Sequence, residues 1–256
     1  MPLPQRHLFT CWDEVARRLR GAPAIALFLD FDGTLSALCP RPEQVQLSGG
    51  TRHVVAILAR RPRFRVWVIS GRRRDDVRNR SRIAGVHYLG LHGWEGRQSV
   101  SIREETRQLL EGLKSRAREI VQRAPAAWVE DKGAAVTIHY ANASAVDVHR
   151  IRQEMASALF PLNGLFRGIA GERGFELAPT EVGDKGTAVR HELAIASRAA
   201  LPVSVGDDAV DEPVFAALAD GITIRVGRPG PTRARFRLDG VKQVRMFLER
   251  LNKEVQ

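Results

Sequence analysis

The sequence of 256 residues contains few cysteines and no long apolar run. Its only cysteines are Cys11 and Cys39, which have no C-x-x-C spacing, so the sequence predicts neither a zinc site nor a disulfide framework. Unpaired cysteines are typical of a reducing cytoplasm. No stretch approaches the roughly 18 apolar residues of a membrane span, and the N-terminus lacks the apolar core of a signal peptide. We therefore expect a soluble cytoplasmic protein with no membrane partner.

Acidic residues are scarce relative to basic ones. Lys and Arg total 40 against 29 Asp and Glu, which gives a formal net charge of +11. Such an excess is compatible with nucleic acid, an anionic surface or an anionic small substrate. The sequence has no cluster of aromatic and basic residues and no zinc-finger or RNP-like string, so a nucleic-acid interface would rest on charge alone. Because the arginines are spread along the chain, we expect no nucleic-acid partner.

Strand-like and helix-like segments alternate near both ends of the chain. The expected strands cover 24–29, 64–69, 87–91, 202–205 and 222–226. The expected helices between and after them cover 50–61, 75–83, 183–196, 213–219 and 241–251. This alternation predicts an α/β fold with a doubly wound, Rossmann-like parallel sheet.

The middle of the chain has a different pattern. We expect two helices at 103–123 and 145–160, a hairpin over 127–140 and a last hairpin around 171–177. We interpret this block as an α+β cap domain inserted into the α/β core. The predicted domains are a core of residues 1–102 and 180–256 and a cap of residues 103–179.

The most informative segment is the apolar run 24–29 followed by Asp30-Phe31-Asp32-Gly33-Thr34. Six apolar residues are typical of a strand buried on both faces of a parallel sheet. Two carboxylates then leave the C-terminal end of the strand, where open α/β sheets bind ligands. Burial of such charges costs free energy unless a metal, a hydrogen-bond network or a reaction offsets it. An isolated Asp-x-Asp is more often an ordinary turn, but the full string is more specific.

Further polar strings follow expected core strands or begin core helices. They are Ser70-Gly71-Arg72, Lys185 within Gly183-Asp184-Lys185-Gly186, and Gly206-Asp207-Asp208 with Asp211. Each is common by itself as a turn, a helix start or a cap. In this order, a doubly wound sheet would bring all of them to one edge beside Asp30.

Together these residues predict phosphoryl transfer through an aspartyl phosphate. Asp30 is the expected nucleophile, and Asp32 would protonate the leaving oxygen and later activate water. Lys185 would stabilise the developing charge, while the Ser70 hydroxyl and neighbouring backbone N–H groups, including that of Gly71, bind the transferring group.

A magnesium ion is expected beside the nucleophile, because a carboxylate that attacks a phosphate needs positive charge between them. Its expected ligands are the Asp30 and Asp207 carboxylates and the backbone carbonyl of Asp32. Asp208 and Asp211 are expected to orient metal-bound waters or Lys185.

The four strings resemble the haloacid dehalogenase phosphatases, and other strings are similar to the trehalose-6-phosphate phosphatases. These are residues 88–95 (YLGLHGWE), 129–133 (VEDKG), 138–140 (IHY), 175–177 (FEL) and 206–215, within a match from about Pro23 to Leu248. The resemblance implies a Mg²⁺-dependent hydrolase of trehalose biosynthesis whose cap closes on the sugar. It implies Thr34 as part of the catalytic motif, and substrate contacts from Arg72, His92, Gly93, Glu130, Lys132 and Glu176.

Three positions depart from the family pattern: Ala141 and Ala178 stand where basic residues are usual, and Val210 stands in place of Thr. The alternative substrate is therefore another phosphorylated sugar or glycoside, such as glucosylglycerol phosphate. A non-catalytic basic binding protein on the same fold is the alternative of a different class. Glu130 with Lys132 would otherwise be a solvated hairpin pair, and His92 a structural histidine beside a turn. We expect a small sugar phosphate as partner, and a monomer or weak dimer.

Overall fold

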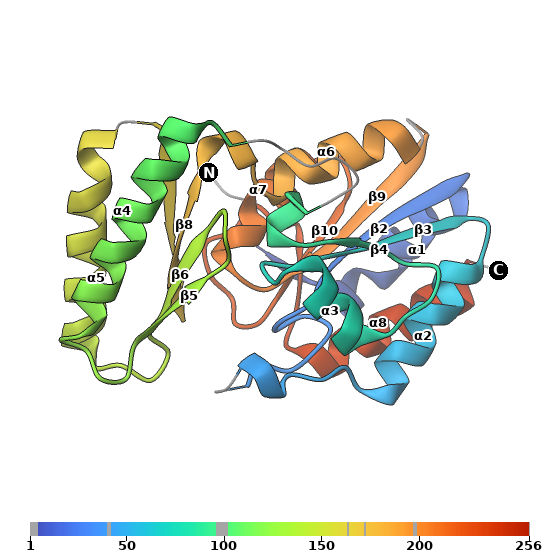
Figure 1. Cartoon of the computed structure of the whole chain (residues 1–256). Coiled ribbons are helices and arrows are strands. Elements are labelled where there is room, and N and C mark those ends of the chain that lie inside the picture. Colours follow the sequence, from blue (N-terminus) through green and yellow to red (C-terminus); the bar gives the residue numbers. More distant parts are fainter. Residues whose placement is uncertain are drawn as a thin grey trace. The chain divides into compact units, whose positions relative to one another are not determined.

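A seven-stranded parallel sheet forms the centre of the first of two structural units in the computed structural model (Figure 1). The structure describes residues 5–39, 42–95, 102–162, 164–171, 173–196 and 199–255. The first unit, called the core unit, comprises Met1–Gly96 and Lys185–Gln256, and the second, called the inserted unit, comprises Arg97–Asp184. The predicted cap of 103–179 lies within the inserted unit, and its role as a cap stays a prediction. Residues 96–101, near the predicted boundary, lie outside the described residues.

The strand order of the core sheet confirms the predicted doubly wound architecture. In spatial order the strands are β1 (Arg6–His7), β11 (Phe236–Leu238), β10 (Ile222–Val226), β9 (Ala200–Gly206), β2 (Ala24–Asp30), β3 (Phe64–Ile69) and β4 (His87–Leu89). Every neighbouring pair is parallel. The short strands β1 and β11 at one edge were not predicted, because two and three residues are too few to show a hydrophobic period.

Helices cover both faces of this sheet. They are α1 (Trp12–Gly21), α2 (Gly49–Arg60), α3 (Arg74–Ser81), α6 (Lys185–Ala196), α7 (Glu212–Ala217) and α8 (Val241–Glu254). Helix α1, which the sequence prediction omitted, buries Val15 and Leu19 while its remaining positions are rich in charge. In Figure 1, α6 lies on one side of the sheet and α2 and α8 lie on the other.

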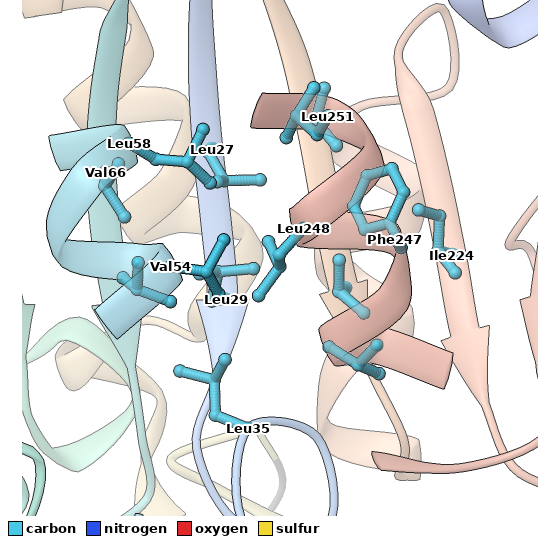
Figure 2. Packing of buried hydrophobic residues seen from close by; sticks show 14 of the residues in the cluster. Leu27, Leu29, Leu35, Val54, Leu58, Val66, Ile224, Phe247, Leu248 and Leu251 are labelled. Atoms are coloured by element: carbon cyan, nitrogen blue, oxygen red, sulfur yellow. The ribbon is translucent and has the colours of Figure 1, made fainter. Parts of the chain in front are cut away.

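Strand β2 is buried on both faces, as the apolar run predicts. Leu27 and Leu29 pack in one cluster with residues of α2 and α8, among them Leu58 and Leu248 (Figure 2). The alternate residue Phe28 lies in a second cluster, which includes residues of α6 and α7. Burial of each such side chain contributes about 1.5–3 kcal/mol. Asp30 therefore emerges at the end of a strand that packing holds from both sides.

The inserted unit has its own antiparallel sheet and core. The strands run in the order β5 (Trp128–Asp131), β6 (Val136–His139), β8 (Gly174–Pro179) and β7 (Phe166–Ala170), with helices α4 (Glu104–Val121) and α5 (Ala145–Leu159). Alternate strand residues such as Ile138 and Leu177 pack in one cluster with residues of the two helices. The period of two leaves the other sheet face to polar side chains. Glu172, in the predicted last hairpin, lies outside the described residues.

Every helix in the described part of the chain is too short or too polar to cross a membrane.

Candidate active site

The C-terminal ends of three adjacent strands carry the predicted catalytic strings. Strand β2 ends at Asp30, β3 ends one residue before Ser70, and β9 ends one residue before Asp207. These strands are neighbours in the order β9-β2-β3, and parallel pairing places their ends at the same edge of the sheet. The strand that supplies Asp30 is therefore in the middle of the site.

Lys185 is the first residue of α6 and joins two carboxylates. Its Nζ atom donates to Asp30 Oδ1 at 2.6 Å and to Asp211 Oδ1 at 2.8 Å. The Lys185 side chain is only 2% exposed, and Asp30 and Asp211 are also buried. Charge-assisted hydrogen bonds of this length offset much of the desolvation of the ammonium group. The sequence prediction that Lys185 lies beside Asp30 thus agrees with the geometry.

A third carboxylate, that of Asp207, completes an acidic group. Oxygens of Asp30, Asp207 and Asp211 all lie within 4.8 Å of one another, close enough to hold one metal ion. Asp207 Oδ1 accepts a hydrogen bond from Thr34 Oγ1 at 3.2 Å. Gly33 has a φ of +84°, and a side chain there would collide with the Asp207 carboxylate. The turn after Asp32 therefore needs glycine for both its backbone and its space.

Negative charge exceeds positive charge within this buried group. Burial, followed by the charge of Asp211, raises the pKa of Asp30 to about 7, against the lowering effect of Lys185. Burial and the neighbouring Asp30 also raise the pKa of Asp207 well above its ordinary value. Burial lowers the pKa of Lys185, but Asp211 and Asp30 more than reverse this, and the net pKa is raised. When all three carboxylates are ionised, they exceed the one ammonium by two negative charges, which a divalent cation with oxygen ligands would neutralise.

Asp211 already has partners for both of its oxygens. Oδ1 accepts from Lys185, and Oδ2 accepts from the backbone N–H groups of Asp207 at 3.1 Å and Asp208 at 3.2 Å. Asp208 in turn accepts from Ala209 N at 2.7 Å at the start of a 3₁₀ turn. These bonds favour Asp30 and Asp207 as metal ligands, with Asp211 as the group that orients Lys185 and the loop. The predicted ligand role of the Asp32 carbonyl stays a prediction.

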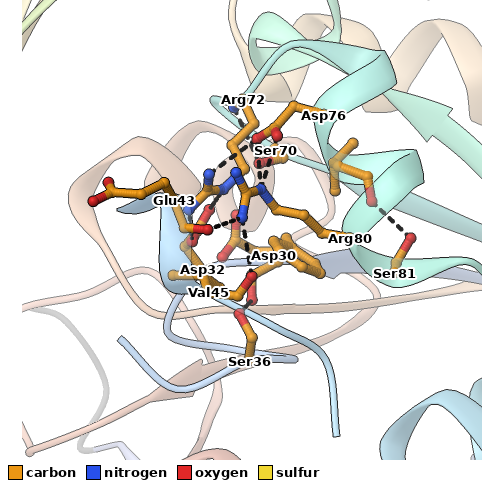
Figure 3. Close-up of polar contacts among 12 residues, drawn as sticks. Asp30, Asp32, Ser36, Glu43, Val45, Ser70, Arg72, Asp76, Arg80 and Ser81 are labelled. Atoms are coloured by element: carbon orange, nitrogen blue, oxygen red, sulfur yellow. Dashed lines mark hydrogen bonds and ion pairs between the residues drawn. The ribbon is translucent and has the colours of Figure 1, made fainter. Parts of the chain in front are cut away.

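The Asp32 carboxylate faces an arginine and not the acidic group. Arg72 Nε donates to Asp32 Oδ2 at 2.7 Å and Arg72 Nη2 donates to Oδ1 at 2.8 Å (Figure 3). Both are predicted site residues, but no pattern in the sequence indicates that they bind each other. Burial lowers the pKa of Arg72, but the bonds to Asp32 outweigh this effect and the net pKa is raised.

Ser70 and His92 lie in adjoining loops at the same sheet edge. Ser70 is buried, and its Oγ accepts from Arg72 N at 3.1 Å, across the intervening Gly71. His92 N donates to the Ser70 carbonyl at 2.9 Å, and His92 has a left-handed φ of 59°. Gly93 approaches α6 so closely that a side chain there would collide with Ala188. The structure thus gives Gly93 a packing role, and its predicted substrate contact stays a prediction.

In the inserted unit, the predicted sugar-binding residues form a connected group. Lys132 Nζ donates to Glu176 Oε2 at 3.2 Å and lies 3.9 Å from Glu130 Oε2. His139 Nε2 lies 2.8 Å from Glu130 Oε2, and the His139 ring stacks on Trp128 with centroids 4.0 Å apart. Lys132 is buried, so it is not half of a solvated pair.

Three further charged residues were not predicted from the sequence. Asp76 and Arg80 extend the contacts of Arg72 along α3, at positions four and eight residues further on. That helical spacing was visible in the sequence, and it is the signal that would have found them. Arg167 is directly paired with Ala178 between β7 and β8, which no local pattern indicates.

Comparisons with known proteins agree with this geometry. The trehalose-phosphatase family model matches residues 28–240. The probable trehalose-phosphate phosphatase C of Arabidopsis thaliana is 28% identical over 94% of this chain and 81% of that protein. A Mycobacterium tuberculosis protein described as an uncharacterized glycosyl hydrolase is 33% identical over 94% of this chain, which spans only 19% of that protein. The C-terminal domain of a C. albicans trehalose-6-phosphate phosphatase shares the fold, with a TM-score of 0.86, 18% identity and coverage of 98% of this chain and 99% of that one.

The matched segment includes Asp30, Lys185 and Asp207 and extends through the inserted unit. It therefore covers both the acidic group and the polar sheet face. The chain belongs to the trehalose-phosphatase family, a family of phosphoric monoester hydrolases with the haloacid dehalogenase fold.

Proposed function

We propose that this protein is a Mg²⁺-dependent phosphatase that hydrolyses trehalose 6-phosphate to trehalose and phosphate. The observation that carries the proposal is the buried Lys185 bonded to Asp30 and Asp211, with Asp207 in the same acidic group. The names of the Arabidopsis and C. albicans relatives support the substrate. A non-catalytic binding protein would gain nothing from this arrangement of buried charges, which costs folding free energy.

In the first step, an Asp30 oxygen forms a bond to phosphorus as the bond from phosphorus to the sugar oxygen breaks. Lys185 holds Asp30 Oδ1, so Oδ2 is the oxygen that Lys185 leaves for attack. Asp32 gives its proton to the departing sugar oxygen. In the second step a water oxygen bonds to phosphorus, its proton goes to Asp32, and the bond from phosphorus to Asp30 breaks.

Asp30 and Asp207 would hold Mg²⁺, with the Asp32 carbonyl as a further ligand. When bound, Mg²⁺ neutralises the negative charge of these carboxylates and of the phosphoryl oxygens. Thr34 fixes one oxygen of Asp207, and Ser70 supplies a hydroxyl for the transferring group.

We propose that the inserted unit determines which sugar is accepted, through Glu130, Lys132 and Glu176. Arg167 adds a cation to the sheet face that carries Glu176. It is paired directly with Ala178, and Ala178 and Glu176 are two residues apart on β8, so all three lie on one face. This arginine offsets the loss of a basic residue at position 178. It therefore supports a phosphorylated sugar as substrate despite that departure.

A second candidate is a phosphatase for another phosphorylated sugar or glycoside, such as glucosylglycerol phosphate. Ala141 favours it, because no charged side chain is available at that position to bind the substrate. The proposed partner in either case is a small sugar phosphate. The monomeric or weakly dimeric state and the cytoplasmic location stay predictions.

Phosphate release from a panel of sugar phosphates tests the proposal. The purified protein is assayed with Mg²⁺ and with excess chelator on trehalose 6-phosphate, glucosylglycerol phosphate, glucose 6-phosphate and p-nitrophenyl phosphate. We expect the highest kcat/KM on trehalose 6-phosphate, and only with Mg²⁺. A clear preference for another sugar phosphate would favour the second candidate. Undiminished activity in chelator would contradict the metal assignment.

A further inference from the structure

Arg72 has a carboxylate acceptor for each of its three guanidinium nitrogens. Nε and Nη2 donate to the two oxygens of Asp32, at 2.7 and 2.8 Å, and Nη1 donates to Asp76 Oδ2 at 3.0 Å. The Arg72 side chain is only 13% exposed. A planar fork of this kind fixes a carboxylate in both position and orientation.

Asp76 is in turn held by Arg80. Arg80 Nε donates to Asp76 Oδ1 at 2.8 Å and to Oδ2 at 2.9 Å, and Arg80 Nη1 donates to the backbone carbonyls of Glu43 at 2.6 Å and Val45 at 3.2 Å (Figure 3). Because Asp76 and Arg80 lie one helical turn apart on α3, the helix sets their separation. Asp32, Arg72, Asp76 and Arg80 thus form a row of charges of alternating sign. Its last member, Arg80, is anchored to backbone carbonyls of the segment before α2.

The arrangement leaves Arg72 poorly suited to bind a phosphoryl group. Three of its five N–H donors already point at carboxylates, and the side chain cannot turn its two-donor fork toward a phosphoryl group without giving up the charge-assisted hydrogen bonds to Asp32. Such a turn would also remove the contact that orients the Asp32 carboxylate. The bonds use one lone pair on each Asp32 oxygen, and each oxygen keeps a second. Asp32 can therefore accept a proton from water while Arg72 holds it.

We propose that Arg72 is a positioning residue for Asp32 and does not bind substrate, and that Asp76 and Arg80 position Arg72. The inference rests on the proposed function. It concerns the second step, in which water bonds to phosphorus, a water proton goes to an Asp32 oxygen, and the bond from phosphorus to Asp30 breaks. A misplaced Asp32 slows this step even when the first step is intact.

The test uses p-nitrophenyl phosphate, whose p-nitrophenolate leaves without a proton from Asp32. If Arg72 positions Asp32, Arg72→Gln forms the phosphoenzyme normally and hydrolyses it slowly. We expect a rapid burst of about one p-nitrophenolate per enzyme, a steady-state kcat lowered about 10- to 100-fold, and little change in KM. Trapped phosphoenzyme should rise in parallel. Arg72→Lys should resemble Arg72→Gln, because an ammonium cannot donate two parallel hydrogen bonds.

Asp76→Asn provides an independent variant that leaves Arg72 and Asp32 in place. We expect the same burst with a smaller loss, about 3- to 10-fold in kcat, because Arg72 keeps its two hydrogen bonds to Asp32 while its ion pair with Asp76 is lost. The matched controls are Asp75→Asn and Arg78→Gln on the same helix, whose side chains are exposed. Both should give wild-type burst and steady-state rates, and thermal unfolding should show that all variants are folded.

A raised KM without a burst in Arg72→Gln, or normal kinetics in Arg72→Lys, would overturn the inference and make Arg72 a substrate ligand. A burst of equal size in the controls would overturn it as well. Failure of the proposed function is a separate result: the wild-type protein would then cleave p-nitrophenyl phosphate and no sugar phosphate, and the burst pattern would still decide the role of Arg72.

Discussion

Asp30, the proposed nucleophile, lies in an unfavourable charge environment. Burial raises its pKa to about 7, and Asp207 and Asp211 lie beside it. We expect Asp30→Asn to lower kcat by about a thousandfold or more, since an amide is not a nucleophile for phosphorus. The thermal unfolding temperature without metal should be unchanged or higher, because one crowded carboxylate is removed. Steady-state assays and calorimetry check both expectations.

The matched control for Asp30→Asn is Asp13→Asn, at an exposed position of α1. It should keep wild-type kinetics. Phosphate release by Asp30→Asn at a near wild-type rate would contradict the aspartyl-phosphate mechanism.

Lys185 is the only cation bonded to the acidic group among the described residues. Lys185→Met should leave buried carboxylates uncompensated and lower the free energy of unfolding by about 3–5 kcal/mol in chelator. Denaturant unfolding with Lys242→Met on the exposed face of α8 as control measures this loss. Added Mg²⁺ should recover part of it, and an unchanged stability in chelator would show that the carboxylates are protonated without Lys185.

At the scale of elements, the β7–β8 pairing decides where charge lies on the polar sheet face. The Arg167 side chain is half-buried and makes no hydrogen bond or ion pair with the residues that the structure describes. We expect Arg167→Ala to lower kcat/KM on trehalose 6-phosphate about tenfold to a hundredfold, because a charged hydrogen bond to substrate is worth about 1.5–3 kcal/mol. The loss on p-nitrophenyl phosphate should be much smaller.

The control for this prediction is Arg107→Ala, at an exposed position of α4. Equal losses on both substrates from Arg167→Ala would assign Arg167 to the stability of the sheet and not to substrate selection.

The β5–β6 hairpin carries a pH-dependent contribution to stability. Burial raises the pKa of Asp131, but hydrogen bonds from Lys114 and from the backbone of Gly133 outweigh it and the net pKa is lowered. A lowered pKa means that the contribution is present above the ordinary pKa of aspartate and is lost as the pH falls through the lowered value. Asp131→Asn should therefore destabilise the protein at neutral pH by about 1 kcal/mol or less.

Chemical unfolding at pH 7 and at progressively lower pH tests this sign. The difference between wild type and Asp131→Asn should shrink as the pH falls, whereas Glu105→Gln at an exposed position of α4 should show no such trend. A difference that grows in acid would contradict the assignment.

At the scale of the whole molecule, a basic protein with a net charge of +11 contains a buried group of three carboxylates and only one ammonium. Mg²⁺ at about 100 times its Kd should stabilise the folded state by about 2.7 kcal/mol. For a chain of this size that corresponds to a rise in Tm of about 5–10 °C. Thermal unfolding with and without Mg²⁺ should show the rise in wild type and in the control Asp220→Asn, at an exposed position before β10, and its loss in Asp207→Asn. An equal rise in Asp207→Asn would place the ion elsewhere.

Local patterns were sufficient for the elements that frame the site. The run 24–29 alone indicated a strand buried on both faces, and Leu27 and Phe28 do pack in clusters on opposite faces. Ser48 caps the start of α2 by accepting a hydrogen bond from Thr51 N, and the helix ends just before Pro62. The residues that start and stop this helix thus lie within or beside it in the sequence. Such features depend on neighbours along the chain.

The sequence by itself determined the α/β core, the order of its polar strings and the edge at which they meet, because hydrophobic period and parallel pairing follow from local pattern. Only the tertiary structure decided which charge faces which. Asp32 faces Arg72 across 40 positions of sequence, Lys185 reaches Asp30 across 155, and Arg167 lies opposite Ala178 by the register of two strands. Each of these contacts depends on packing between distant elements, and a change of one residue in strand register would move Arg167 to the other face of its sheet.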